Sequence, residues 1–249
     1  MPRDSTVAAV PAPAVAFLDV GLRLRYRDWG GDGPPVLFLH GGGLDGSAWD
    51  AVCEALGDDC RCIALDQRGH GASAWAPDAD YSLAAYVADL AAVVAALELD
   101  APTIVGQSMG AMNALGFAVL HQPRLTALAF VDASPIRLNA AKADRWLTVV
   151  QQRRPDTATY DPAAMEIAAI QGHRAEAAAL APRLGAVTCP ALVINGAISP
   201  IISRDEATQF TAGLARGELV VVPDAGHNVQ FDQPEALAAL VRRSVARRS

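Results

Sequence analysis

The chain has 249 residues, a length that suits one domain with a substantial hydrophobic core. Hydrophobic residues make up 52% and charged residues 19%, which is typical of a well-packed globular protein. The net charge of −7 argues against nucleic-acid binding, and no apolar run approaches the roughly 20 residues of a membrane span.

The four cysteines and the start of the chain bear on its compartment. No two cysteines form a C-x-x-C pair, and no histidine stands at metal-ligand spacing to any of them. Residues 1–15 contain no sustained apolar block, so the sequence predicts no signal peptide. We therefore expect a reducing, cytoplasmic setting without metal or structural disulfides.

Strand and helix patterns alternate along most of the chain. Residues 22–27 alternate apolar and charged side chains, which indicates an antiparallel strand with one wet face, and 14–18 is its expected hairpin partner. Apolar runs typical of buried parallel strands occupy 36–39, 62–65, 103–105, 127–131, 191–194 and 219–222. Helices are predicted over about 47–56, 82–98, 109–121, 204–215 and 234–246. This alternation predicts an α/β fold with a doubly wound, mostly parallel sheet.

One stretch, residues 135–187, breaks the alternation within the single domain expected over 1–249. It carries helical, polar and Ala-rich sequence and no strand pattern. Its apolar side chains either line a pocket or pack the stretch onto the core. They are Ile136, Leu138, Trp146, Leu147, Met165 and Ile170.

A G-x-S-x-G pattern, Gly106 to Gly110, lies between an apolar strand and a predicted helix. This context is typical of a nucleophile elbow, a sharp turn that presents a serine oxygen at the carboxyl edge of a sheet. The flanking glycines are needed because side chains there would collide with the neighbouring strand and helix. The pattern predicts Ser108 as a nucleophile.

Three further motifs follow predicted strands. His40-Gly41-Gly42-Gly43 comes directly after 36–39, where glycines let backbone N–H groups converge on a ligand oxygen, as an oxyanion hole requires. Residues 66–73, Asp-Gln-Arg-Gly-His-Gly-Ala-Ser, follow the next apolar run. Gly226-His227 follows the last one, so that His227 can reach a serine on another loop of the same sheet edge.

With these four motifs in this order, and Trp49 downstream of the first, the chain resembles the α/β-hydrolase family from about residue 16 to 239. The resemblance implies that residues 135–187 form a short helical cap over an active site. His40 and His70 resemble structural loop histidines of the family, and His121 lies at the far end of the helix predicted after the elbow, so His227 is the expected base. His173, within the predicted cap, either meets the substrate or lies at the exposed surface, and we expect the exposed position.

The resemblance also bears on the oxyanion hole and on the acid of a serine triad. It implies that the N–H groups of Gly42 and Met109 are the oxyanion donors, with Gly41 and Gly43 beside them. The family most often places the acid after the seventh strand, about three residues past a glycine. That position holds Ser199, which cannot carry the charge.

Some members of the family place the acid after the sixth strand, and Asp132 stands there. We therefore predict Ser108, His227 and Asp132 as the catalytic residues. The alternative role for Asp132 is a structural cap beneath the helical insertion. Asp205 and Asp224 are weaker candidates, because Asp205 is expected to open a helix and Asp224 is too close to the histidine along the chain.

The sequence favours a serine hydrolase that cleaves a small, largely apolar ester, thioester or lactone through an acyl-enzyme, with no cofactor. One alternative keeps the fold but makes the protein a carbon–carbon bond hydrolase, a perhydrolase or a cofactor-free oxygenase. Another, suggested by Ser199, is a non-catalytic ligand-binding protein on a hydrolase scaffold. The expected partner is a small-molecule substrate, and we expect binding to neither nucleic acid nor membrane. The sequence leaves open whether the protein forms a homodimer.

Overall fold

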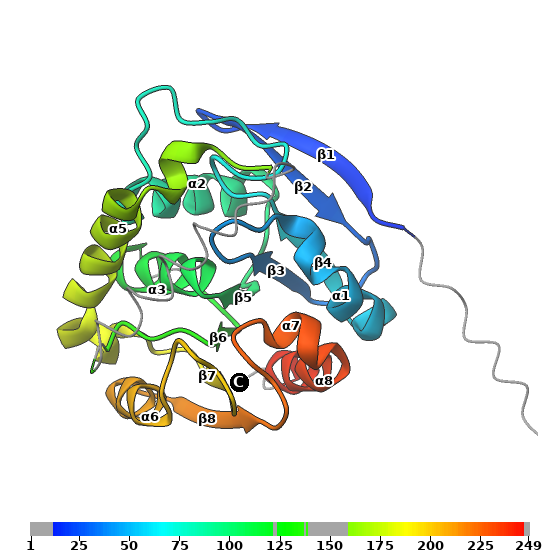
Figure 1. Ribbon diagram of the computed structural model, residues 1–249. Coiled ribbons are helices and arrows are strands. Elements are labelled where there is room, and N and C mark those ends of the chain that lie inside the picture. Colours follow the sequence, from blue (N-terminus) through cyan, green and yellow to red (C-terminus); the bar gives the residue numbers. More distant parts are fainter. Residues whose placement is uncertain (1–11, 122–123, 137, 139–158, 247–249) are drawn as a thin grey trace, which may run out of the picture.

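The computed structural model describes residues 12–121, 124–136, 138 and 159–246. Within them, eight strands form one sheet in the order β1-β2-β4-β3-β5-β6-β7-β8 (Figure 1). β2 pairs antiparallel with both neighbours, and β3 to β8 are parallel. The strands are β1 Ala14–Asp19, β2 Arg23–Asp28, β3 Pro35–Leu39, β4 Arg61–Leu65, β5 Thr103–Gln107, β6 Ala127–Val131, β7 Ala191–Gly196 and β8 Gly217–Val222. The predicted doubly wound, mostly parallel sheet is confirmed.

Helices cover both faces of the sheet. The α-helices are α1 Asp50–Leu56, α2 Leu83–Ala96, α3 Met109–His121, α5 Ile167–Ala179, α6 Arg204–Gly213, α7 Val229–Asp232 and α8 Pro234–Val245. The 3₁₀ helices are η1 Gly46–Trp49, η2 Gly57–Asp59, η3 Pro162–Met165 and η4 Ala181–Ala186. α2, α3 and α6 pack on one face, and α1 and α8 pack on the other. Alternate residues of a central strand therefore enter different cores, which explains why these strands are apolar throughout.

Side-chain caps set where several helices begin. The Asp45 side chain accepts a hydrogen bond from the Ser47 N–H at the start of η1, and Ser82 accepts one from Ala85 at the start of α2. These caps satisfy N–H groups that have no partner within the helix.

The described part of the predicted cap, 135–136, 138 and 159–187, contains η3, α5 and η4. α5 packs against α2 and α3. Met165 is buried, Ile136 packs against the core and Leu138 is exposed, while Trp146 and Leu147 lie outside the described residues. The extent of the cap over 135–187 and the single domain over 1–249 stay predictions.

Two findings concern the expected setting of the chain. No helix among the described residues is long and apolar enough to cross a membrane. The four cysteines are free thiols, of which Cys53, Cys60 and Cys62 are buried and Cys189 is half-buried.

The core of the sheet provides a test of the packing. Phe130 in β6 is fully buried, and its ring centroid lies 5.0 Å from that of Phe210 in α6. We expect Phe130→Ala to lower the free energy of unfolding by about 3–5 kcal/mol, because it removes buried surface and leaves a cavity. Urea denaturation measures this. The control is Phe17→Ala, at a 40% exposed position in β1, where a change of about 1 kcal/mol or less is expected. Equal losses in both variants would contradict the assigned core.

Candidate active site

The turn between β5 and α3 has the geometry of a nucleophile elbow. Ser108 has φ 51°, a left-handed conformation, and its N–H donates to the Val131 carbonyl across the sheet edge. A Cβ at Gly106 would lie 2.5 Å from the backbone N of Ala111, and one at Gly110 would lie 2.6 Å from the His40 carbonyl oxygen. Glycine is therefore required on both sides of Ser108.

The loop after β3 lies directly against this turn. A Cβ at Gly41 would stand 3.3 Å from the Ser108 Cβ, and one at Gly42 would stand 3.4 Å from Met165 Sδ and 3.9 Å from Met109 Sδ. Gly43, with φ 77°, has Met165 Cε 3.6 Å from its Cβ position. The structure thus gathers the predicted oxyanion residues around Ser108, with η3 of the insertion beside them.

Side chains hold the first two peptide units of this loop. The Gln67 N–H donates to His40 Nε2 at 3.0 Å, so the ring proton is on Nδ1, which donates to the Gly41 carbonyl at 2.8 Å. Gln67 Nε2 donates to the His40 carbonyl at 2.7 Å. Burial lowers the pKa of His40 to about 4, so the ring is neutral near pH 7. The structural role expected for this histidine agrees with these contacts.

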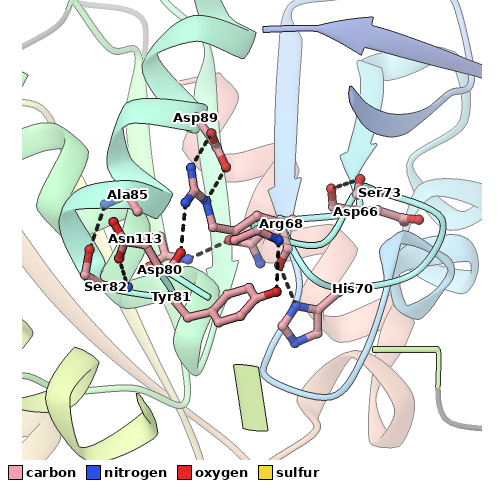
Figure 2. Close-up of polar contacts among 12 residues, drawn as sticks. Asp66, Arg68, His70, Ser73, Asp80, Tyr81, Ser82, Ala85, Asp89 and Asn113 are labelled. Atoms are coloured by element: carbon pink, nitrogen blue, oxygen red, sulfur yellow. Dashed lines mark hydrogen bonds and ion pairs between the residues drawn. The ribbon is translucent and has the colours of Figure 1, made fainter. Parts of the chain in front are cut away.

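The loop after β4, which carries Gln67, is itself firmly anchored (Figure 2). Arg68 makes a bidentate ion pair with Asp89 of α2, with N–O distances of 2.6 and 2.7 Å. His70 is fully buried, donates from Nδ1 to the Arg68 carbonyl, and has a pKa lowered to about 3 by burial. These contacts account for His70 as a structural loop histidine.

The acid and the base of the predicted triad are in direct contact. Asp132 has φ 46° directly after β6, and His227 follows β8. His227 Nδ1 lies 2.7 Å from Asp132 Oδ2. A carboxylate only accepts hydrogen bonds, so Nδ1 carries a proton, and in the neutral ring Nε2 has the lone pair that a general base needs.

Residues that the sequence reasoning did not assign hold this pair in place. Ser199 Oγ donates to Asp132 Oδ2 at 2.6 Å, and Asn195 Nδ2 and the Gly196 N–H donate to Oδ1 at 2.9 and 3.0 Å. Gln107 Nε2 donates to the His227 carbonyl at 3.1 Å. Ser199 therefore occupies the family's usual acid position as a hydrogen-bond donor to the acid from the neighbouring strand.

The remaining candidates lie elsewhere. Asp205 is exposed in the first turn of α6, and Asp224 is exposed before the histidine loop. The expectation for His173 is wrong: it is buried, 6% exposed, with Nε2 2.7 Å from Asn113 Oδ1. Among the described residues, no group of three or more His, Cys, Asp or Glu side chains could hold a metal ion.

Comparison with known proteins agrees with this fold and motif set. Residues 36–240 match the model of the alpha/beta hydrolase family, so the chain belongs to that family, as the resemblance predicts. Esterase Rv0045c of Mycobacterium tuberculosis is 28% identical over 93% of this chain and 89% of its own length. The structure of that esterase superposes with a TM-score of 0.74, at 26% identity, over 95% of this chain and 93% of its own.

Two other known proteins resemble this chain over most of its length. The 2-(acetamidomethylene)succinate hydrolase of Mesorhizobium japonicum is 26% identical over 88% of this chain and 90% of its own length. A thermophilic esterase from Thermogutta terrifontis superposes with a TM-score of 0.79, at 24% identity, over 95% of this chain and all of its own. The latter likeness establishes the fold alone. Family and relatives together make this protein an enzyme of the hydrolase type.

The contact between Ser199 and Asp132 has a measurable consequence. We expect Ser199→Ala to lower the free energy of unfolding by about 1.5–3 kcal/mol, because a buried carboxylate loses a donor. Urea denaturation compares it with Thr208→Ala, an exposed hydroxyl on α6 that bonds only the Arg204 carbonyl in its own helix. The control should change by about 0.5 kcal/mol or less. A Ser199→Ala variant as stable as the control would show that the hydroxyl does not support the acid.

Proposed function

We propose that this protein is a serine hydrolase that cleaves a small, largely apolar ester, thioester or lactone through an acyl-enzyme. The observation that carries the proposal is the 2.7 Å contact between His227 and a buried Asp132, at the same sheet edge as the Ser108 elbow. No other described carboxylate among the predicted candidates makes such a contact.

The proposed reaction uses these three residues in sequence. Ser108 Oγ attacks the acyl carbon while His227 Nε2 takes its proton, and Asp132 stabilises the resulting imidazolium. The histidine then protonates the leaving oxygen or sulfur, which departs and leaves an acyl-serine. A water molecule, deprotonated by the same histidine, attacks the ester and releases the acid product and free serine.

The developing oxyanion is assigned to the N–H groups of Gly42 and Met109. Removal of one such donor typically costs about 10²–10³ in rate, so loop geometry matters as much as the triad. The contacts of His40 and Gln67 with this loop support the assignment, because they fix the direction of its peptide units before substrate binds. Gly41 and Gly43 keep the backbone free of side chains there.

An apolar substrate is favoured by the side chains nearest the loop. Met109 and Met165 both approach the Gly42 position with their thioether sulfurs, which are soft and apolar. The esterase of M. tuberculosis supports ester cleavage, whereas the M. japonicum hydrolase is named for a dicarboxylic substrate. We place the small apolar ester first because of the two methionines. The homodimer and the cytoplasmic setting stay predictions.

The acyl-enzyme is tested with Ser108→Ala. We expect wild type to be labelled by a fluorophosphonate and to show a burst with p-nitrophenyl butyrate, and the variant to lose both, because the attacking oxygen is gone. Thermal melting should be almost unchanged, since only one hydroxyl is lost. Ser47→Ala, at an exposed serine, is the control and should keep full labelling.

The same experiment separates the rival functions. Turnover of a carbon acid or peroxide chemistry without labelling would favour base-only catalysis by His227. Ligand binding with no turnover of any kind would favour the non-catalytic alternative. Retained ester turnover in Ser108→Ala would remove the serine as nucleophile.

The acid is tested with Asp132→Asn. The amide keeps the shape but favours the wrong imidazole tautomer, so we expect kcat to fall by about 10²–10⁴. Adding Ser199→Asp should recover part of the activity, because the Ser199 side chain already reaches the same side of the Asp132 carboxylate as His227. Steady-state kinetics measure both variants. A near wild-type rate for Asp132→Asn would show that the histidine needs no acid at this position.

A further inference from the structure

A continuous set of side-chain hydrogen bonds runs from the insertion to the loop after β3. His173 Nε2 on α5 lies 2.7 Å from Asn113 Oδ1 on α3, and Asn113 Nδ2 donates to Gln67 Oε1 at 2.7 Å. Gln67 then donates from Nε2 to the His40 carbonyl and from its backbone N–H to the His40 ring. Four elements far apart in the sequence are joined by these contacts.

The donors and acceptors along this path are fixed by chemistry. Asn113 uses its NH₂ on Gln67, so its Oδ1 can only accept, and His173 Nε2 must carry the proton. Gln67 likewise accepts with Oε1 and donates with Nε2. Burial, with the nearby Arg174, lowers the pKa of His173 to about 4, so the ring is neutral near pH 7. Only one orientation of each amide satisfies the whole path.

Each member of the path is shielded from water. His173, Asn113, Gln67 and His40 are 6%, 1%, 4% and 0% exposed. A buried acceptor that loses its donor is strongly disfavoured, so each amide is held by its neighbours. Tyr86 of α2 meets the His173 ring edge-on, with centroids 5.6 Å apart, which orients the imidazole toward Asn113.

The far end of the path determines the direction of the oxyanion donor. Gln67 holds the His40 carbonyl, and the His40 ring holds the Gly41 carbonyl. The described chain has no cis peptide bonds, so the Gly42 N–H points opposite to the Gly41 carbonyl of the same peptide unit. Because the His40 ring holds the Gly41 carbonyl on its own side, the Gly42 N–H points away from that ring.

α5 depends on this contact more than an ordinary amphipathic helix would. Its buried residues are His173 and Ala177, and of its two isoleucines Ile170 is half-buried and Ile167 is exposed. Little apolar side-chain surface holds this helix against α3. The histidine thus gives α5 a specific, buried hydrogen bond to α3.

We infer that His173 is a positioning residue for the oxyanion hole, acting from the insertion through Asn113 and Gln67 on the His40–Gly42 backbone. The inference rests on the proposed serine hydrolase for its effect on rate, but not for its effect on the loop. According to this inference, the position of α5 on α3 affects the direction of the Gly42 N–H through one path of hydrogen bonds.

The loop itself is measured by hydrogen–deuterium exchange with mass spectrometry. Two amides report on the path: Leu44, whose N–H donates to the Gly41 carbonyl, and Gln67, whose N–H donates to the His40 ring. We expect His173→Phe to speed exchange of peptides spanning 40–45 and 66–69 by about tenfold, because the path loses its first donor. Peptides from β6 should stay protected, which separates a local change from global unfolding.

Kinetics on p-nitrophenyl butyrate give the second measurement. We expect His173→Phe to lower kcat about tenfold with KM within about twofold, less than the loss of an oxyanion donor because the N–H is misaligned rather than removed. His173→Gln should restore both measurements to within about threefold, because its amide nitrogen reaches the position of Nε2. Gln171→Ala, exposed on the same helix, should match wild type.

Several outcomes overturn the inference. If peptides spanning 40–45 and 66–69 exchange equally fast in His173→Phe and Gln171→Ala, His173 does not act on the loop, whatever the value of kcat. A rise in KM alone, or failure of His173→Gln to restore the loop, would make His173 a packing residue only. If wild type hydrolyses no ester, the proposed function fails, while the exchange measurement still decides whether His173 controls the loop.

Discussion

The buried carboxylate of Asp132 is the group on which the geometry of the site depends. A carboxylate removed from water is strongly disfavoured unless donors surround it. Its donors come from the end of β7, from the loop after β7 and from the loop after β8. The pairing of β6 with β7 and of β7 with β8 decides where these segments begin. The register of the sheet therefore decides whether the Asp132 carboxylate receives its hydrogen bonds.

This constraint explains how the predicted acid can stand after β6 when the family's usual position holds Ser199. Parallel neighbours end side by side, so loops after β6 and β7 both reach the histidine after β8. Once the carboxylate comes from Asp132, a second charge at position 199 would be repelled, whereas a hydroxyl donates to the first. In this chain the carboxylate therefore follows β6, and a hydroxyl that donates to it follows β7.

Local patterns allowed the strands, the principal helices and the elbow to be predicted. Each of the six predicted apolar runs lies within an observed strand, and Asp45 and Ser82 cap helices as their residue types favour. The contact between Asp132 and His227 agrees with the predicted pair, because the carboxyl ends of parallel strands meet at one edge, while the catalytic roles of both residues stay predictions. The roles of Asn195 and His173 were missed, since a polar residue that bonds a distant polar residue leaves no periodic signal. An exposed position was expected for His173 because a histidine on an Ala-rich helix has the same local sequence whether it is solvated or buried.

A polar path has a property that an apolar contact between insertion and core would lack. Two apolar surfaces can slide past each other with small changes in free energy. Each amide side chain in the path from His173 to His40 has two fixed partners, so only one orientation satisfies both. Because coupling between two sites is reciprocal, a ligand oxyanion that favours the aligned Gly42 N–H must also favour the seated α5. Binding of a tetrahedral mimic should then tighten the contact between His173 and Asn113. The insertion would respond to the chemistry at Ser108 without touching the reacting atoms.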